Sequence, residues 1–227
     1  MKAKLHAEPR DSRTRVFVVD DHPIVRQGLA QLINQEADLI VCGEAGDSVE
    51  ALQMMASLKP DIVIADVSLR GGDGIELVKN IRMQDPDLPV LVLSMHDETL
   101  YAERALRAGA RGYIMKQEPP EQVMVALRQV RSREIYLSES MGKRMLQQIV
   151  GGSHPAGSPI ERLSDRELEV FRLIGQGHGT RQIAEELHVS VKTVESYRAH
   201  IKEKMLIGNA YELVQHAVQW LENEKGR

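Results

Sequence analysis

Five polar residues stand directly after short apolar runs in the first half of the chain: Asp20, Asp21, Asp66, Ser94 and Lys116. If they meet in space, three carboxylates repel one another, and the simplest compensation is a hard divalent cation. Mg²⁺ prefers a few carboxylates together with water and phosphate oxygens. Such a set suits phosphoryl transfer onto a carboxylate, with Asp66 attacking phosphorus to form an aspartyl phosphate. Lys116 would neutralise the phosphoryl oxygens in the transition state, and Ser94 would donate a hydrogen bond to the bound phosphoryl group.

The apolar runs themselves predict the element that positions these residues. They are continuous rather than alternating, which is typical of strands buried on both faces of a parallel sheet. Segments with helical spacing separate them, so the pattern predicts a doubly wound five-stranded α/β domain. With strand order 2-1-3-4-5, strands 1 and 3 are neighbours at the switch point where ligands bind. The runs cover residues 15–19, 39–42, 61–65, 89–93 and 112–115.

A single aspartate at a strand end has a plainer explanation, since it is most often a helix cap or a loop residue. Asp20-Asp-His-Pro23 is also a good helix start, with proline in the first turn. Five polar residues at four strand ends nevertheless form a joint pattern that chance rarely produces. The pattern therefore favours the phosphoryl-transfer site.

The second half of the chain contains no strand-like run. Residues 136–160 read as a linker with a helix over 138–149, followed by a segment rich in Gly, Pro and Ser over 151–159. Four helices are predicted after it, over 164–176, 180–187, 191–205 and 209–223. Ser164 and Glu167 have the spacing of a capping box, and Ser190 and Asn209 are predicted caps. A small all-α domain over 161–227 follows.

The helix over 191–205 has an apolar stripe and an opposite polar face. Val194, Tyr197, Ile201 and Met205 recur at intervals of three and four, as in any amphipathic surface helix. The short turn 188–190 joins it to the preceding helix, which is the arrangement of a helix-turn-helix. In that motif the second helix enters the major groove of DNA.

Composition excludes several classes of protein. The 227 residues contain 29 Lys and Arg against 33 Asp and Glu, a formal charge of −4, which excludes a generally basic nucleic-acid coat protein. One cysteine excludes a disulfide framework and a cysteine-based zinc site. Residues 1–14, taken as a flexible tail, lack the apolar core of a signal peptide, and no run is long enough for a membrane helix. We therefore expect a cytoplasmic protein with no membrane partner.

Five segments of the first domain resemble the receiver domain of bacterial two-component response regulators over residues 15–135. They are Val18–Leu29, with the sequence VVDDHPIVRQGL, Asp61–Asp66, Gly74–Leu77, Leu93–Glu98 and Gly109–Lys116. The resemblance implies a CheY-like fold in which Asp66 accepts phosphate from a sensor histidine kinase. It further implies a Mg²⁺ site formed by Asp20, Asp21, Asp66 and the Ser68 carbonyl, and a switch pair formed by Ser94 and Tyr113. The chain departs from the family at Leu69 and Arg70, where Met-Pro is usual, which puts metal affinity and phosphoryl lifetime in question.

The C-terminal helices resemble the LuxR-type helix-turn-helix, through Leu163–Val170, Gln182–Leu187 and Val189–Ile201. The whole chain therefore looks like a NarL/FixJ-family response regulator. The resemblance implies contacts to double-stranded operator DNA from Thr180, Arg181, Lys192, Thr193, Glu195, Ser196, Arg198, Ala199 and Lys202. It also implies a dimerisation helix carrying Leu213, Val214, Ala217 and Leu221, although these residues could equally pack in the domain's own core.

The favoured hypothesis is a regulatory protein that catalyses only its own phosphoryl uptake and loss. Phosphorylation on Asp66 would control homodimerisation and sequence-specific DNA binding, and thereby transcription. A Mg²⁺-dependent phosphatase is one alternative, but it typically needs a second acid two residues after the nucleophile, where Ser68 stands. An RNA-binding antiterminator is another, against which the helix-turn-helix spacing argues.

Overall fold

The computed structural model describes residues 12–69, 72–95, 98–150 and 159–225. The chain divides into two compact units, which are described separately. One contains most of the described residues up to Leu137, and the other contains the described residues from Ser138 onward. None of the helices among the described residues is long and apolar enough to cross a membrane.

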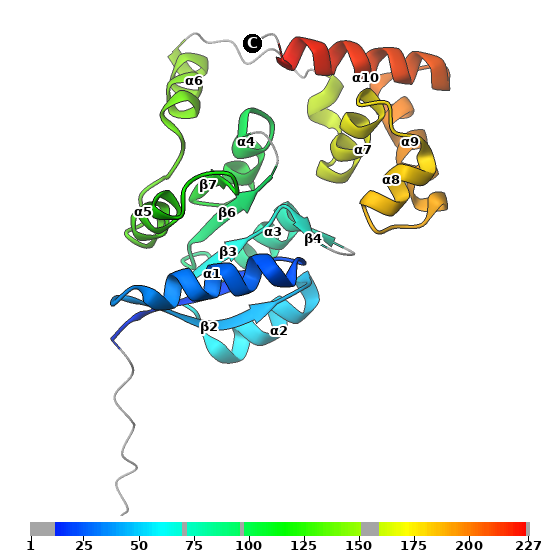
Figure 1. Ribbon diagram of the computed structural model, residues 1–227. Helices are drawn as coiled ribbons and strands as arrows, with labels where there is room; N and C mark the ends of the chain where they lie inside the picture. The colour runs from blue at the N-terminus through cyan, green and yellow to red at the C-terminus, as the bar shows by residue number, and fades with distance from the viewer. Residues whose placement is uncertain (1–11, 70–71, 96–97, 151–158, 226–227) are drawn as a thin grey trace, which may run out of the picture. The chain divides into compact units, whose positions relative to one another are not determined.

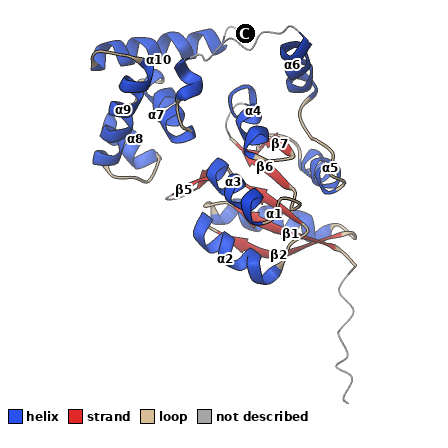
Figure 2. Ribbon diagram, turned by 180° about the vertical axis from the view of Figure 1, so that it is seen from behind, coloured by secondary structure: helices blue, strands red, loops and turns tan. Residues whose placement is uncertain are grey.

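Five parallel strands form the sheet of the first unit in the order β2-β1-β3-β6-β7 (Figures 1 and 2). Counted among themselves, these strands have the predicted order 2-1-3-4-5, and the doubly wound α/β fold is confirmed. Their bounds are β1 Thr14–Val19, β2 Leu39–Ala45, β3 Ile62–Ala65, β6 Val90–Ser94 and β7 Gly112–Met115.

Five helices alternate with these strands. They are α1 Pro23–Gln35, α2 Ser48–Leu58, α3 Gly74–Gln84, α4 Glu98–Ala108 and α5 Pro120–Arg131. The aliphatic residues of alternate strand positions, such as Val16, Ile64 and Leu91, pack in one core cluster with the apolar faces of α1 and α5. Phe17 projects from the other face toward α2, where a Cβ on Gly43 would lie 2.6 Å from both Phe17 and Leu58. The sheet is therefore buried on both faces, as its continuous apolar runs predicted.

The segment after Asp66 contains two short strands that the sequence did not predict. β4 (Ser68–Leu69) pairs with β5 (Gly72–Asp73) in a two-stranded sheet. Leu69 is fully buried, so its apolar side chain gives this segment an anchor. Arg70 lies outside the described residues.

The described part of the chain from Ser138 onward is helical. It contains α6 Glu139–Val150, the 3₁₀ turn η1 Pro159–Arg162, α7 Asp165–Gly175, α8 Thr180–Glu186, α9 Val191–Met205 and α10 Ala210–Lys225. Both α9 and α10 pack against α7, and α8 packs against α9. The capping box is confirmed, because Ser164 Oγ accepts the Glu167 amide at 3.3 Å and the Glu167 carboxylate accepts the Ser164 amide at 2.7 Å. Ser190 and Asn209 also accept amide hydrogen bonds at the starts of α9 and α10.

The C-terminal end of α9 has an unfavourable residue. Leu206 has φ 57° and ψ 41°, the left-handed conformation that favours glycine, and it is 86% exposed. We expect Leu206→Gly to raise the free energy of unfolding of this unit by about 1 kcal/mol. Leu206→Ala keeps the Cβ and serves as the matched control with no comparable gain. Urea unfolding followed by fluorescence of Trp220, the only tryptophan, measures the difference; equal effects of Gly and Ala would contradict the explanation.

An ion pair with a buried carboxylate joins α7 to α9. Lys204 Nζ donates to Glu167 Oε2 at 2.6 Å, and the Glu167 side chain is 4% exposed. Burial alone would raise the pKa of Glu167, but the hydrogen bonds from Lys204 and Ser164 outweigh it and lower this pKa below its ordinary value.

The lowered pKa makes the stability of this unit depend on pH. A carboxyl group whose pKa is depressed by folding stabilises the fold above its unfolded pKa of about 4.3, and that contribution is lost as the pH falls through the folded value. We expect the free energy of unfolding to fall below about pH 4.5 more steeply in the wild type than in Glu167→Gln. Trp220 fluorescence in urea at several pH values tests this, and parallel curves would contradict it.

Candidate acidic site and helix-turn-helix surface

Two buried carboxylates meet at the carboxyl edge of the sheet. Asp20 follows β1 and Asp66 follows β3, and the register pairs Val19 with Ala65 immediately before them. Their amides continue the ladder, from Asp66 to Val19 O at 2.9 Å and from Asp20 to Ala45 O at 3.2 Å. Asp20 is 1% exposed and Asp66 is 3% exposed. The strand order thus brings together residues that are 46 positions apart in the sequence.

Lys116 reaches this pair from the end of β7. Its Nζ lies 2.5 Å from Asp20 Oδ2 and 2.7 Å from Asp66 Oδ2, and its amide donates to Ser94 O at 2.8 Å. Burial is the largest influence on Asp66 and, with the Asp20 charge, raises its pKa above the ordinary value despite Lys116. Burial opposes the charge on Lys116, but the two carboxylates outweigh it and raise the pKa of Lys116. The ammonium therefore stays charged beside the carboxylates.

His22 and Arg26 also contact Asp20, although sequence reasoning assigned them no role in the site. The His22 amide donates to Asp20 Oδ1 at 2.8 Å. Asp20 therefore also stabilises the loop before α1, which is the plainer role of an aspartate at a strand end. His22 Nδ1 lies 2.7 Å from Asp21 Oδ1 and 3.3 Å from Asp20 Oδ1. Arg26 donates to the Asp20 carbonyl at 2.5 Å. Both residues follow Asp20 closely at the start of α1, and this spacing could have indicated that they contact it.

The carboxylates have the character of a cation site. One oxygen or nitrogen from each of Asp20, Asp21, His22 and Asp66 lies within 4.8 Å of the others. Two buried oxygens, Asp20 Oδ2 and Asp21 Oδ1, accept no well-aligned hydrogen bond from the described residues, although Lys116 and His22 lie within ion-pair distance of them. Clustered, incompletely satisfied carboxylate oxygens are the donors that Mg²⁺ prefers, so the residues present fit this ion.

The remaining predicted site residues surround this cluster. Ser94 at the end of β6 and Tyr113 in β7 are both fully buried. The register pairs Val92 with Tyr113 and Ser94 with Met115, so Ser94 and Tyr113 project from the same face of the sheet. The Ser68 amide donates to the Asp66 carboxylate and lowers its pKa, against the larger effect of burial. Ser68 thus contacts the site through its amide as well as lying where the carbonyl ligand was predicted.

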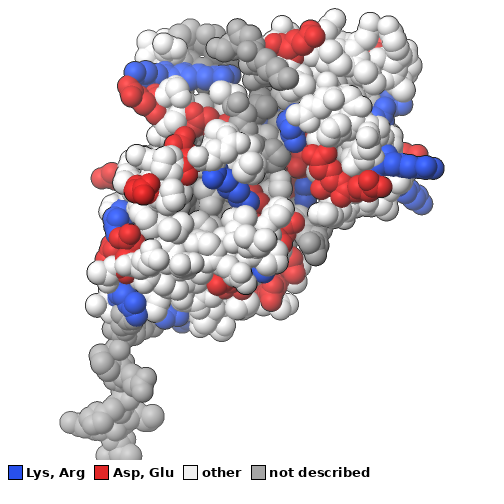
Figure 3. Space-filling view, viewed as in Figure 1, with Lys and Arg blue, Asp and Glu red and all other residues white. Residues whose placement is uncertain are grey.

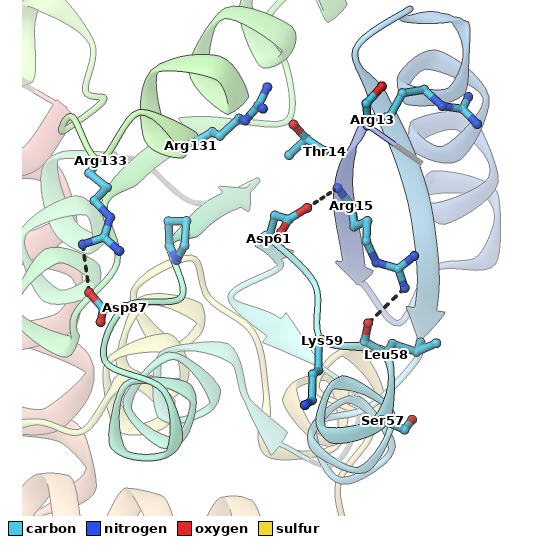
Figure 4. A pocket seen from close by; sticks show the side chains of 12 residues that line it. Arg13, Thr14, Arg15, Ser57, Leu58, Lys59, Asp61, Asp87, Arg131 and Arg133 are labelled. Atoms are coloured by element: carbon cyan, nitrogen blue, oxygen red, sulfur yellow. Dashed lines mark hydrogen bonds and ion pairs between the residues drawn. The ribbon is translucent and has the colours of Figure 1, made fainter. Parts of the chain in front are cut away.

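A hollow lies at the opposite, amino-terminal edge of the sheet (Figure 4). Its volume is about 590 Å³, and Arg15, Asp61, Asp87 and Arg133 are among the residues that line it. Both carboxylates are engaged, since Asp61 accepts the Arg15 amide at 2.8 Å and Asp87 accepts from Arg133 at 2.9 Å. Both acids of this hollow therefore take part in hydrogen bonds within the chain.

The predicted DNA-contact face of α9 is exposed to solvent. Lys192, Glu195, Ser196 and Ala199 are exposed, while Val194 and Ile201 on the opposite side are fully buried. Five further predicted residues differ in exposure: Arg181 on α8 is exposed, whereas Thr180, Thr193, Arg198 and Lys202 are half-buried. Both acidic and basic side chains lie on the face of this unit that Figure 3 shows, in line with ten Lys and Arg against eleven Asp and Glu over 161–227.

The predicted dimerisation residues require a correction. Leu213 and Ala217 are fully buried in the unit's own core, and the Ala217 carbonyl and Leu221 lie beside Gly175 of α7. These three residues recur every four positions and form the face of α10 that packs on α7. Val214 is 40% exposed and Leu221 is half-buried, so Val214 is the most accessible of the four to a partner. The apolar spacing alone could not separate the core face from the exposed face.

Two family models match the chain. The first, for the response regulator receiver domain, matches residues 16–128, and the second, for bacterial regulatory proteins of the luxR family, matches residues 161–217. The first match contains the acidic site, and the second contains the four helices from α7 through most of α10.

Similar proteins extend over nearly the whole chain. The oxygen regulatory protein NreC of Staphylococcus aureus is 36% identical over 210 residues, which are 90% of this chain and 97% of that protein. RcsB of Salmonella enterica serovar Typhimurium, solved bound to promoter rprA with the phosphomimetic BeF₃⁻, is 28% identical, with TM-score 0.58 over 91% of this chain and 98% of RcsB. A LuxR-family response regulator from Aurantimonas is 34% identical, with TM-score 0.57 over 61% of this chain and 99% of that one. With a receiver sheet, an acidic site and a LuxR-type helix-turn-helix in one chain, this protein belongs to the NarL/FixJ-type two-component response regulators that regulate transcription.

Proposed function

We propose that this protein is switched by phosphorylation on Asp66, with phosphate taken from a sensor histidine kinase. The observation that carries the proposal is the bridge of Lys116 Nζ between Asp20 Oδ2 and Asp66 Oδ2, at 2.5 Å and 2.7 Å. It places a buried carboxylate, a fixed cation and a cluster of incompletely satisfied acids at one edge of the sheet. These are the groups that the transfer of a phosphoryl group onto a carboxylate requires.

In the proposed transfer a carboxylate oxygen of Asp66 forms the new bond to phosphorus. The bond from phosphorus to the histidine nitrogen of the kinase breaks, and the nitrogen keeps its electron pair. Asp20, Asp21, Asp66 and the Ser68 carbonyl would hold a Mg²⁺ ion, which would supply positive charge to the phosphoryl oxygens. Lys116 supplies a second positive charge from the protein itself.

Ser94 and Tyr113 form the proposed link from the site to the rest of the receiver. Both are fully buried and project from one face of neighbouring strands. In the proposal the Ser94 hydroxyl donates to the phosphoryl group, and the Tyr113 ring repacks behind it. Phosphorylation needs to shift the equilibrium between two states by only about 1–3 kcal/mol to change DNA binding substantially.

The proposed output is binding of a homodimer to double-stranded operator DNA. RcsB, similar over most of the chain, was solved on promoter DNA, and a second RcsB structure contains two dimers on two DNAs. The basic charge here is local, with four Lys or Arg against two Glu in residues 191–205. Because phosphate neutralisation supplies most non-specific affinity, one copy should bind weakly. Two copies on two half-sites then provide the specific affinity.

We further propose that the protein is no enzyme for an external substrate. A phosphatase built on Asp66 needs a general acid two residues later, and Ser68 there offers its amide to Asp66. Steady hydrolysis of an added phosphoester by the purified chain would contradict this part of the proposal.

The test of the switch combines phosphorylation with DNA selection. The full chain is treated with a small phosphodonor and Mg²⁺, and bound fragments are selected from genomic DNA. We expect the phosphorylated chain to enrich a small set of fragments that share paired half-sites. Identical enrichment with and without the phosphodonor would contradict phosphorylation control.

The exposed face of α9 gives a separate prediction for DNA binding. We expect Lys192→Ala to weaken operator binding about tenfold, because it removes one contact to DNA, and Glu195→Ala to relax the preference for one base pair. Both side chains are exposed, so phosphoryl uptake should be unchanged. Gln219→Ala on α10 is the matched exposed control. Fluorescence anisotropy measures DNA binding, and parallel loss of phosphorylation would indicate a folding defect instead.

A further inference from the structure

We propose that His22 is a nitrogen ligand of the acidic site, so that the site takes divalent transition cations such as Zn²⁺ and Cu²⁺ besides Mg²⁺. The inference rests on the proposed cation site and adds a residue that selects among cations. Hard Mg²⁺ prefers oxygen ligands, whereas imidazole nitrogen suits zinc and copper. A histidine beside the carboxylates therefore changes which ion the site prefers.

The donor atoms are already close to the spacing of metal ligands. His22 Nδ1 lies 3.3 Å from Asp20 Oδ1 and 2.7 Å from Asp21 Oδ1. Two ligands at the usual distances from zinc, on a tetrahedral centre, are about 3.3 Å apart. The first distance matches this value, and the second is shorter, at the distance of a direct ion pair. Small outward movement of the imidazole ring is enough to admit an ion.

The backbone holds His22 in position for this role. Its amide is fixed by Asp20 Oδ1 at 2.8 Å, and Pro23 follows as the first residue of α1. Its side chain is 61% exposed, so the ring is free to adjust, whereas the side chains of Asp20 and Asp21 are 2% and 8% exposed. Asp20 Oδ2 and Asp21 Oδ1 are the buried oxygens without a well-aligned hydrogen bond from the described residues. The arrangement places two buried carboxylates beside one exposed imidazole nitrogen.

Two consequences follow for the ions. Zn²⁺ and Mg²⁺ share the carboxylates, so each excludes the other. The nitrogen contributes to the binding of Zn²⁺ and contributes nothing to the binding of Mg²⁺. The ratio of the two affinities therefore isolates the contribution of His22 from that of the carboxylates.

The experiment measures both affinities by calorimetry on the full chain. The variants are His22→Phe, Asp21→Asn and, as the matched control, His216→Phe at an exposed position of α10. Titrating Zn²⁺ with and without saturating Mg²⁺ separates the shared site from other zinc-binding groups. We expect His22→Phe to weaken Zn²⁺ at the shared site at least about tenfold and to leave Mg²⁺ nearly unchanged. His216→Phe should alter neither.

Copper supplies a readout that does not depend on affinity. Cu²⁺ bound at the site should show nitrogen hyperfine coupling in its electron paramagnetic resonance spectrum, and His22→Phe should lose the component that Mg²⁺ displaces. Equal change of both affinities in His22→Phe, or persistence of that coupling, overturns the role of His22 alone. Failure of Mg²⁺ to compete with Zn²⁺, with no effect of Asp21→Asn, overturns the proposed cation site and this inference with it.

Discussion

Asp66→Asn is expected to reduce phosphoryl uptake from a small phosphodonor at least about 1,000-fold, because it removes the attacking oxygen. The amide keeps the shape of the carboxylate and can still face Lys116, which lies 2.7 Å from Asp66 Oδ2. It also removes one charge from a cluster of three acids. The fold should therefore survive, and intact-protein mass spectrometry, which resolves one added phosphoryl group, measures the loss.

The matched control for Asp66 lies at the other end of the same strand. Asp61 immediately precedes β3, is exposed, and accepts the Arg15 amide at 2.8 Å. Asp61→Asn makes the same chemical change away from the acidic site and should leave phosphorylation at the wild-type level. A phosphorylated Asp66→Asn chain would show that another residue is the acceptor.

Lys116→Met is expected to lower the stability of the receiver unit by about 3–5 kcal/mol, the usual effect of removing one partner from a buried ion pair. The Lys116 side chain is 9% exposed, and its two partners are nearly dry at 2% and 4%. Methionine fills a similar volume but leaves both carboxylates without their cation. Thermal unfolding followed by near-ultraviolet circular dichroism of the buried Tyr101 and Tyr113 reports on this unit.

Added Mg²⁺ tests whether the stability lost in Lys116→Met comes from the uncompensated carboxylates. An added cation at the carboxylates should recover part of the lost stability, so Mg²⁺ should raise the unfolding temperature of Lys116→Met more than that of the wild type. Lys79→Met is the control, since the Lys79 pair with Glu76 is exposed on α3 and should contribute less than about 1 kcal/mol. An unchanged unfolding temperature in Lys116→Met would contradict the structural role of the bridge.

The sheet was predictable because its signal is local. Each run of aliphatic residues is long enough for one strand and too short for a helix. Residues such as Val18 and Ile64 are buried in any compact fold, because exposing their side chains to water costs free energy. The strand β4 was not predictable in this way. It is two residues long, and its pairing with β5 and the burial of Leu69 place it.

For the helices, the sequence predicts an apolar face but does not predict which partner that face packs against. Periodicity predicts that α10 is amphipathic, and Leu213 and Ala217 indeed share one side. Whether that side meets α7 or a second copy depends on packing between elements, and the structure places it against α7. Leu206 is a similar case, since no sequence rule predicts leucine in a left-handed conformation.

By itself the sequence determined which residues carry the chemistry, because strand ends and residue types can be read locally. It placed Asp20, Asp66 and Lys116 at strand ends and so predicted their meeting. Only the tertiary structure decided how they meet, with one ammonium between two carboxylates and His22 Nδ1 beside Asp21. The physical reason is that charge interactions depend on distances of a few ångströms, and these are set by strand register and helix entry across residues far apart in the chain.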